Sequence, residues 1–275
     1  MSLKLKEVYD NIDYVSIKYD TYFQVYESLL KQYIDKEIIL VEVGVFNGGS
    51  LFMWRKYLGP NARIIGIDLN PDALEWQQYG FEIHIGDQSS EEFWIDFYNK
   101  VGVIDVLIDD GGHTNHQQIV TSHFAIQNIK NGGMLIVEDC HCSYFRQFGN
   151  PSRYSFIKYL HCIIDSINSR SYALSRKQTQ YSNRVYSVNI FESIVVFNID
   201  SSRCKDSVPT TNNGKSRYVS DFRYHGEILE ALFIFKNKYA TNQNIVCKIL
   251  TRIVDFILSL FAKVEGLKNR RYFKN

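Results

Sequence analysis

Residues 40–50 read LVEVGVFNGGS, and residues 65–68 read IGID. The first stretch is an apolar run that ends in a glycine-bearing turn, and the second is an apolar run that ends in an acid, Asp68. A glycine turn between a strand and a helix lets a ligand approach the backbone, and an acid at the tip of the next strand can accept both hydroxyls of a ribose. The two stretches together predict a pocket for a nucleoside cofactor.

The spacing of the glycines disfavours a dinucleotide. The dinucleotide fingerprint G-x-G-x-x-G needs a glycine at position 46, where this chain has Phe46. The pattern present is E-x-G-x-x-x-G, formed by Glu42, Gly44 and Gly48. NAD is therefore not expected, although the glycines could also serve an ordinary Rossmann turn without any cofactor.

Apolar runs alternate with helix-length spacers over the first half of the chain, which is the rhythm of a parallel α/β sheet. The expected strands are Ile38–Val43, Arg63–Asp68, Phe81–Gly86, Ile104–Asp109 and Met134–Glu138. The expected helices are Gly49–Tyr57, Asp72–Gln78, Ser90–Lys100 and His116–Lys130, the last closed by Asn131-Gly132-Gly133. The sequence therefore predicts five parallel strands.

The chain continues with a helix expected at about 152–168 and two apolar runs, Val185–Ile190 and Ser193–Ile199. Only two residues separate these runs, which favours an antiparallel pair. The predicted fold is α/β, a Rossmann-like doubly wound sheet of about seven strands, mostly parallel, with an antiparallel last pair. We expect this domain at 1–200, a linker or mobile loop at 201–220, and a helical extension at 221–275.

The extension contains an amphipathic helix, Asn244–Val264. Its polar residues recur every three or four positions and form one narrow stripe: Lys248, Thr251, Arg252, Asp255, Ser259 and Lys263. Polar residues in every turn disfavour a transmembrane span. The helix could pack against the domain or a second copy, or it could lie on the inner face of a membrane with its basic tail meeting anionic lipid.

Composition limits the partners and the compartment. Lys and Arg number 31 against 30 Asp and Glu, so the formal charge of +1 gives no global reason to bind nucleic acid. The start MSLKLKEVYD lacks the apolar core of a signal peptide, and five scattered cysteines favour reduced thiols. A cytoplasmic location is the expectation.

Acids follow two neighbouring strands of the predicted sheet. Asp109 and Asp110 end the fourth run, and Glu138 and Asp139 follow the fifth. The carboxyl ends of parallel strands border one crevice, where like charges repel one another unless a cation lies among them. A hard divalent ion, Mg²⁺, is the simplest candidate. The alternative is that these acids are caps and hydrogen-bond acceptors without a metal.

These stretches resemble class I S-adenosylmethionine (SAM) methyltransferases, and more closely the metal-dependent sugar O-methyltransferases of macrolide pathways, the macrocin and mycinamicin type. The resemblance covers roughly residues 14–199. The matching features are VEVGV at 41–45 with GGS at 48–50, GID at 66–68, DDGGH at 109–113, GGMLIVED at 132–139 and FESIVV at 191–196.

The resemblance implies roles for individual residues. The expected cofactor-binding residues are Glu42, Gly44, Gly48, Asp68, Asp87 and Asp109, with Asp68 at the ribose and Asp87 near the adenine. The expected metal ligands are Asp110, Glu138 and Asp139, and the expected general base is His113. Whether Asp109 or Asp110 faces the ion stays open, since successive side chains at a strand end point oppositely.

Two further features are ambiguous. His116 could be a second base or a substrate contact, or it could merely cap the following helix. Cys140-His141-Cys142 could bind zinc, but its two cysteines lack the usual two-to-four-residue loop between thiolates.

The implied function is a cytoplasmic SAM- and Mg²⁺-dependent O-methyltransferase that acts on a sugar hydroxyl of a glycan precursor or a glycosylated metabolite. Competing hypotheses are a methyltransferase of a small catechol-like or nitrogen acceptor, and a SAM-binding or nucleotide-sugar-binding module without turnover. A homo-oligomer is compatible with each of them.

Overall fold

The computed structural model describes residues 4–149, 152–171, 174, 179, 181–215, 225–239 and 242–273. The chain divides into two compact units, Met1–Pro209 and Thr210–Asn275. The expected linker at 201–220 overlaps this division, and its residues 216–220 lie outside the described part. A short 3-10 turn, η5 (Ser201–Arg203), follows the last strand of the first unit.

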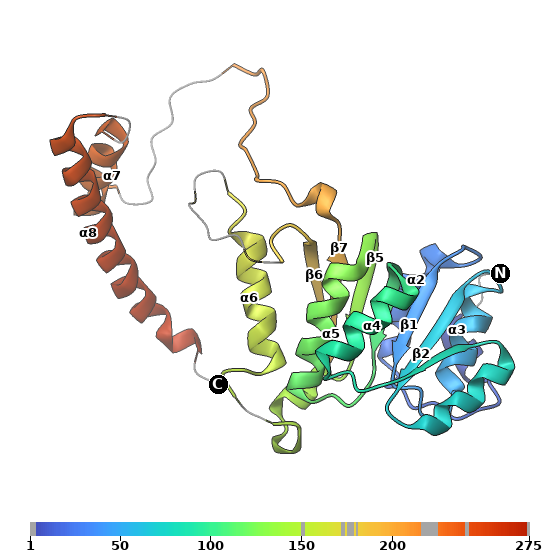
Figure 1. The fold of residues 1–275 in the computed structure, drawn as a ribbon. Coiled ribbons are helices and arrows are strands. Elements are labelled where there is room, and N and C mark those ends of the chain that lie inside the picture. Colours follow the sequence, from blue (N-terminus) through green and yellow to red (C-terminus); the bar gives the residue numbers. More distant parts are fainter. Residues whose placement is uncertain are drawn as a thin grey trace. The chain divides into compact units, whose positions relative to one another are not determined.

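A seven-stranded sheet forms the centre of the first unit (Figure 1). Its strands are β1 (Ile39–Val43), β2 (Arg63–Asp68), β3 (Glu82–Ile85), β4 (Ile104–Asp109), β5 (Ile129–Val137), β6 (Val185–Phe191) and β7 (Ile194–Ile199). The order is β3-β2-β1-β4-β5-β7-β6. The first five strands are parallel, and β7 is antiparallel to both β5 and β6. The predicted fold class is confirmed, and the order reverses between β1 and β4, where such sheets bind ligands.

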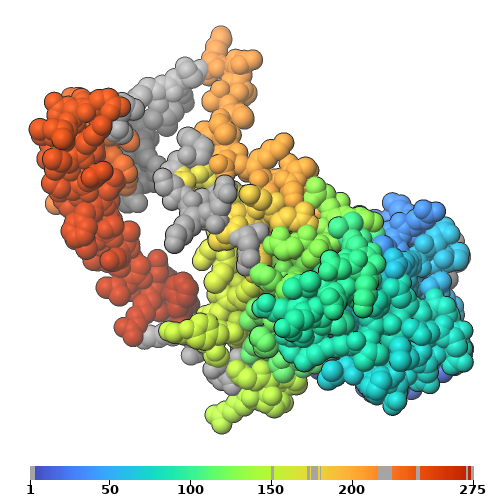
Figure 2. All heavy atoms as spheres, in the orientation of Figure 1, coloured from blue at the N-terminus to red at the C-terminus, as the bar shows by residue number. Residues whose placement is uncertain are grey.

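Helices cover both faces of this sheet because alternate strand residues point to opposite faces. One face packs against α1 (Leu5–Tyr9), α2 (Tyr22–Leu30) and α3 (Gly49–Leu58), together with the 3-10 segments η1 (Lys31–Tyr33) and η2 (Pro71–Tyr79). The other packs against α4 (Glu91–Val101), α5 (Asn115–Asn128) and α6 (Phe156–Asn168). Leu40 faces the first layer and Val41 the second. In Figure 2 the atoms of α4 and α5 form a continuous layer on the side turned to the viewer.

Two local expectations were wrong. Residues 71–79 form a 3-10 segment rather than an α-helix, and its two buried residues, Ala73 and Trp76, lie three positions apart. The glycines at 132 and 133 do not end a helix, because α5 ends at Asn128 and both lie within β5. A Cβ atom on Gly133 would lie 2.3 Å from the carbonyl oxygen of Asp105, so the neighbouring strand requires glycine there.

The second unit contains two helices, α7 (Ile228–Tyr239) and α8 (Ile245–Asn269), followed by the 3-10 turn η6 (Arg270–Phe273). The expected helix Asn244–Val264 is present as α8, which continues to Asn269. None of the helices in the described ranges has the length and the apolar character that a bilayer-spanning segment requires.

Candidate active site

A cavity of about 740 Å³ opens at the carboxyl ends of β1 to β5. This volume is typical of small-molecule sites, which measure roughly 300–1,000 Å³. Its lining includes Gly44 from the β1–α3 turn and acids from the ends of β2 and β3, Asp68 and Asp87. The ends of β4 and β5 add Asp110, His113 and Asp139. The fold thus brings six of the predicted site residues to one cavity.

The turn after β1 requires its glycines. Gly44 has φ +89°, and a Cβ atom there would lie 2.1 Å from the carbonyl oxygen of Asp110. Gly48 has φ +73° and directly precedes α3, and its Cβ atom would collide with the ring of Trp76 at 2.6 Å. Gly44 therefore lets the backbone run close to the cavity, whereas Gly48 shapes the turn and does not line it.

Asp68 holds the glycine turn in place. Its Oδ2 accepts hydrogen bonds from the backbone N–H of Val45 at 2.8 Å and of Phe46 at 3.2 Å, and its Oδ1 accepts one from Asn70. Asp87 accepts hydrogen bonds from the hydroxyl and the backbone N–H of Ser89, which lower the pKa of its carboxyl. Both carboxylates line the cavity, where a ligand hydroxyl or amine can reach them.

Two predicted cofactor residues lie behind the cavity wall. Glu42 is fully buried and accepts hydrogen bonds from Ser50 Oγ at 2.6 Å and Trp54 Nε1 at 3.0 Å. Asp109 is also fully buried, accepts from Gln88 Nε2 at 2.9 Å, and has its pKa raised to about 6 by burial. Neither lines the cavity, and of the pair at the end of β4 it is Asp110 that faces it.

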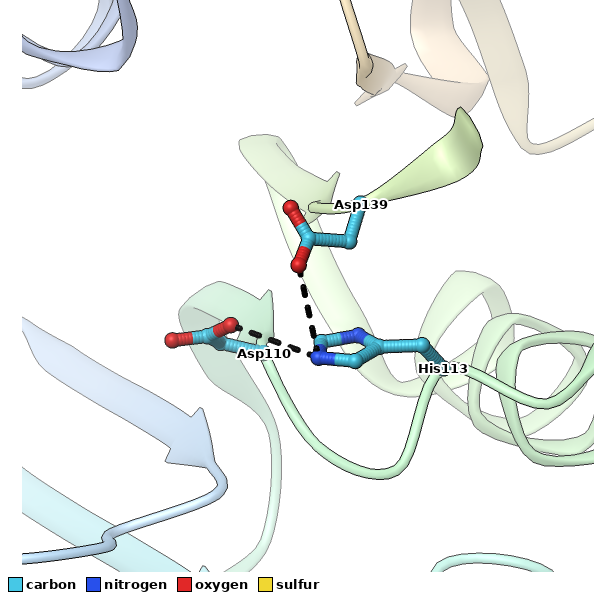
Figure 3. A group of neighbouring side chains, drawn as sticks. All are labelled: Asp110, His113 and Asp139. Carbon is cyan, nitrogen blue, oxygen red and sulfur yellow. Dashed lines mark ion pairs between the residues drawn. The ribbon is translucent and has the colours of Figure 1, made fainter. Parts of the chain in front are cut away.

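Asp110, His113 and Asp139 form a group on the cavity wall that we call the outer group (Figure 3). His113 Nε2 lies 3.5 Å from Asp139 Oδ2 and 3.9 Å from Asp110 Oδ1. One ligand atom from each residue lies within 4.8 Å of the others, close enough to hold a metal ion together. Two carboxylates beside an open cavity fit Mg²⁺, which is usually bound through one or two carboxylates and leaves positions for water and substrate.

Backbone strain accompanies this wall. Five non-glycine residues of the described chain have positive φ, and three of them, Phe46, His113 and Asp139, line the cavity. Such conformations cost about 1–3 kcal/mol each and cluster at functional sites. The buried His113 Nδ1 has no hydrogen-bond partner in the structure. The strain and this unpartnered atom both mark the wall as a place built for a ligand.

A lysine supplies a cation to four neighbouring acids that we call the acidic cluster: Glu42, Asp110, Glu138 and Asp139. Lys18 Nζ lies 2.5 Å from Asp110 Oδ2, 2.7 Å from Glu138 Oε1 and 3.6 Å from Glu42 Oε1, and its side chain is 1% exposed. Burial alone lowers the pKa of a lysine, but the three carboxylates raise the pKa of Lys18 well above its ordinary value. Lys18 therefore stays charged, and we call Lys18, Glu42 and Glu138 the inner group.

Two tyrosines next to Lys18 complete this arrangement. Tyr26 donates to Glu138 Oε1, and Tyr22 donates to Asp139 Oδ1 at 2.5 Å. Burial, and then the charge of Asp110, raise the pKa of Glu138 to about 8, while Lys18 acts in the opposite direction. The expected metal ligand Glu138 is thus fully buried, and its Oε1 is already occupied by two donors of the chain.

Sequence reasoning did not identify Lys18. The available signal is the spacing of Lys18, Tyr22 and Tyr26, four residues apart, with one cation among aromatic residues. The residues before Lys18, Val15 and Ile17, do line the cavity.

His116 lies outside the main cavity. It lines a second cavity of about 500 Å³ together with Thr114, Ile119, Phe148 and Tyr154. The ring of Phe148 lies 6.4 Å from that of His113, so the second cavity adjoins the outer group.

The Cys-His-Cys segment forms the 3-10 turn η3 (Cys140–Tyr144), and both cysteines are buried. In the part of the chain that the structure describes, the outer group alone brings three potential ligands together, and it contains no cysteine. Next to it lies η4 (Arg146–Phe148), which carries Phe148 to the second cavity.

Comparison with known proteins identifies relatives of this chain. No model of a protein family matches it. The mycinamicin VI 2''-O-methyltransferase of Micromonospora griseorubida is 30% identical over 135 residues, which are 46% of this chain and 33% of that protein. Demethylmacrocin O-methyltransferase of Streptomyces fradiae is 26% identical over 134 residues, again 46% of this chain and 33% of that protein.

A solved structure shares the fold. The MycE methyltransferase in complex with Mg, SAH and mycinamycin VI aligns with a TM-score of 0.66 at 21% identity, over 76% of this chain and 56% of that one. The chain matches only about a third of the length of its curated relatives. The chain therefore has the Rossmann-like fold of a methyltransferase, and its sequence is similar to that of sugar O-methyltransferases.

Proposed function

We propose that the protein is a SAM-dependent and Mg²⁺-dependent O-methyltransferase that acts on a sugar hydroxyl of a glycan precursor or a glycosylated metabolite. The observation that carries this proposal is the outer group of Asp110, His113 and Asp139 on the wall of a cavity that Gly44 and Asp68 also line. Relatives named for O-methylation of rhamnosyl, olivosyl and mycinamicin acceptors support it.

The β1–β3 side of the cavity holds the donor in this proposal. SAM supplies a methyl group already activated as a sulfonium. Asp68 is fixed by backbone N–H groups on both oxygens, so its carboxylate can accept ribose hydroxyls without reorganising. Gly44 keeps the cavity wall free of a side chain, and Asp87 is available to the adenine amine.

The outer group holds the acceptor side. Asp110 and Asp139 would bind Mg²⁺, whose charge lowers the pKa of an acceptor hydroxyl placed beside it. Tyr22 fixes the carboxylate of Asp139 from behind, since it donates to Oδ1 and leaves Oδ2 toward His113. Glu138 would become a third ligand only if Lys18 moved away from it, and we therefore assign it to the inner group.

His113 is the proposed general base. Its Nε2 lies between the two carboxylates, 3.5 Å from Asp139 and 3.9 Å from Asp110, next to the place proposed for the metal-bound hydroxyl whose proton it would accept. Such a base contributes about 10²–10⁴ in rate. The second cavity, with Phe148 and Tyr154, offers aromatic surface for a sugar ring on the far side of His113.

The test is incubation of the protein with SAM, Mg²⁺ and a panel of nucleotide sugars and glycosylated metabolites, with release of S-adenosylhomocysteine as the readout. We expect turnover that EDTA abolishes and Mg²⁺ restores. Loss of turnover with deoxy analogues that lack one of two neighbouring hydroxyls would identify a diol acceptor. Turnover on catechols or amines alone would favour the small-acceptor alternative, and SAM binding without any turnover would favour a binding module.

A further inference from the structure

The two units of the chain carry opposite charge. Residues 210–275 contain 12 Lys or Arg and five Asp or Glu, a formal charge of +7, whereas residues 1–209 contain 19 and 25, a formal charge of −6. The near-neutral total therefore hides a strongly basic C-terminal segment. Charge of one sign concentrated on one segment points to a partner of the other sign.

The helices α7 and α8 pack on each other along one side of α8 and leave another side exposed. Lys236 of α7 pairs with Asp255 of α8 at 2.6 Å, and Val254 is the one buried residue of α8. The apolar residues of α8 that remain exposed are Ile245, Val246, Ile249, Leu250, Ile253, Phe256, Leu260, Phe261, Val264 and Leu267.

Most of these residues share one face of the helix. Ile249, Ile253, Phe256 and Leu260 follow one another at steps of three and four, the spacing of one helical face. Phe256 is 63% exposed and Ile253 is 48% exposed. An apolar stripe of this length on a water-exposed protein surface marks a site of protein or membrane contact.

Basic residues border this stripe. Arg252 and Lys263 lie on the neighbouring side of the helix, and both are exposed. Lys268 and Arg270 follow at its C-terminal end. An exposed apolar stripe flanked by Lys and Arg is the arrangement of helices that lie in the interface of an anionic bilayer.

We propose that α8 lies on a bilayer surface containing anionic lipid, with its apolar stripe at the acyl boundary and its basic residues at the headgroups. A second copy of the chain is the less favourable occupant, because it would bring two segments of +7 formal charge together. The inference does not depend on the proposed methyl transfer. It names the chemistry of the partner, which is an anionic lipid surface.

The test is flotation of the full chain with vesicles of phosphatidylcholine alone and of phosphatidylcholine mixed with phosphatidylglycerol. We expect binding to the mixed vesicles, weakened by salt because the contact is partly electrostatic. Lys263→Glu combined with Arg270→Glu should lower the vesicle partition coefficient by more than about tenfold, since each basic residue near the surface contributes about fivefold.

A second variant, with its own control, tests the apolar stripe of α8. Ile253→Glu combined with Phe256→Glu should abolish vesicle binding, while Ile95→Glu, at an exposed isoleucine of α4, should leave it unchanged. Circular dichroism checks that each variant keeps its helices. Failure of the unmodified chain to bind either vesicle overturns the proposal. Equal binding to both vesicle types would also overturn it. So would a dimer of the unmodified chain that the Ile253 and Phe256 double variant dissociates without any change in vesicle binding.

Discussion

The acidic cluster has two sides, which differ in the groups that neutralise their carboxylate charges. On the inner side Glu42 and Glu138 are fully buried, and the Lys18 ammonium lies 3.6 and 2.7 Å from them. On the outer side the carboxylate of Asp139 lines the cavity, where it accepts a hydrogen bond from the Tyr22 hydroxyl and lies 3.5 Å from His113 Nε2. Asp110 belongs to both sides, with Oδ2 toward Lys18 and Oδ1 toward His113.

This difference shows why a strand-end position alone does not make an acid a metal ligand. Four acids converge at the ends of β4 and β5, as the sequence predicts, but the chain supplies its own cation to the buried side. A buried acid paired with a lysine mainly supports the structure, since removal of either partner leaves an uncompensated charge. The acids that still face the cavity are those that a metal and a substrate can reach.

The largest expected effect is on the outer side. Asp139→Asn should reduce methyl transfer to the background rate and abolish its response to Mg²⁺, because one of the two carboxylates of the outer group is lost. These two are Asp110 and Asp139, and not Asp68 or Asp87, which line the donor side of the cavity. SAM affinity, measured by calorimetry, should change little. The matched control is Asp96→Asn at an exposed acid of α4. Equal loss of SAM binding would show that Asp139 belongs to the donor side instead.

Lys18→Met tests the inner side. It should lower the free energy of unfolding by about 3–5 kcal/mol, since the buried carboxylates lose their cation. Urea denaturation measures this loss, with Lys100→Met at an exposed lysine of α4 as the control. Mg²⁺ should stabilise the variant more than the unmodified protein, because carboxylates that have lost their ammonium partner gain more from a nearby cation. A variant as stable as the original would contradict the pairing role of Lys18.

His113→Asn separates a base from a ligand. Asparagine tolerates the positive φ of 56° found at this position. Turnover should fall by about 10²–10⁴ with Mg²⁺ and SAM affinities near normal. A large loss of Mg²⁺ affinity would instead make His113 a metal ligand. His161→Asn, at an exposed histidine of α6, is the control, and an equal fall in turnover with His116→Asn would move the base to the second cavity.

The smallest effect concerns the pH dependence of stability. Burial raises the pKa of Asp109 from 3.8 to about 6, so the folded protein favours the protonated carboxyl. The unmodified protein should therefore lose up to about 3 kcal/mol relative to Asp109→Asn as the pH rises from 3.8 to about 6, and no more above it. Urea denaturation of both proteins across this range checks the sign, and a gain in stability with rising pH would contradict it.

Much of the sheet was predictable because strands buried on both faces are nearly continuous apolar runs. The bounds of β2 and β4 agree with the predicted ones to the residue. The positions of Asp110 and Asp139 were predictable once the strands were known, because parallel strands end at one edge of the sheet. The glycines at 132 and 133 misled because a positive φ, as at Gly132, and a close approach between strands, as at Gly133, select glycine just as a helix stop does.

Lys18 and Glu42 show where sequence reasoning fails. Lys18 meets Asp110, which is 92 positions away in the chain, only because the N-terminal segment crosses the sheet edge. Glu42 fits a cofactor motif, yet its carboxylate is directed to Ser50 and Trp54 of α3. Both facts depend on tertiary packing, and neither follows from local spacing.

The most direct test of the two-sided cluster is anomalous scattering from a crystal grown with S-adenosylhomocysteine and Mn²⁺ in place of Mg²⁺. The account predicts one peak beside Asp110 and Asp139, with Lys18 still paired with Glu138. Absence of any peak at saturating Mn²⁺, or a peak on Glu138 with Lys18 displaced, would contradict it.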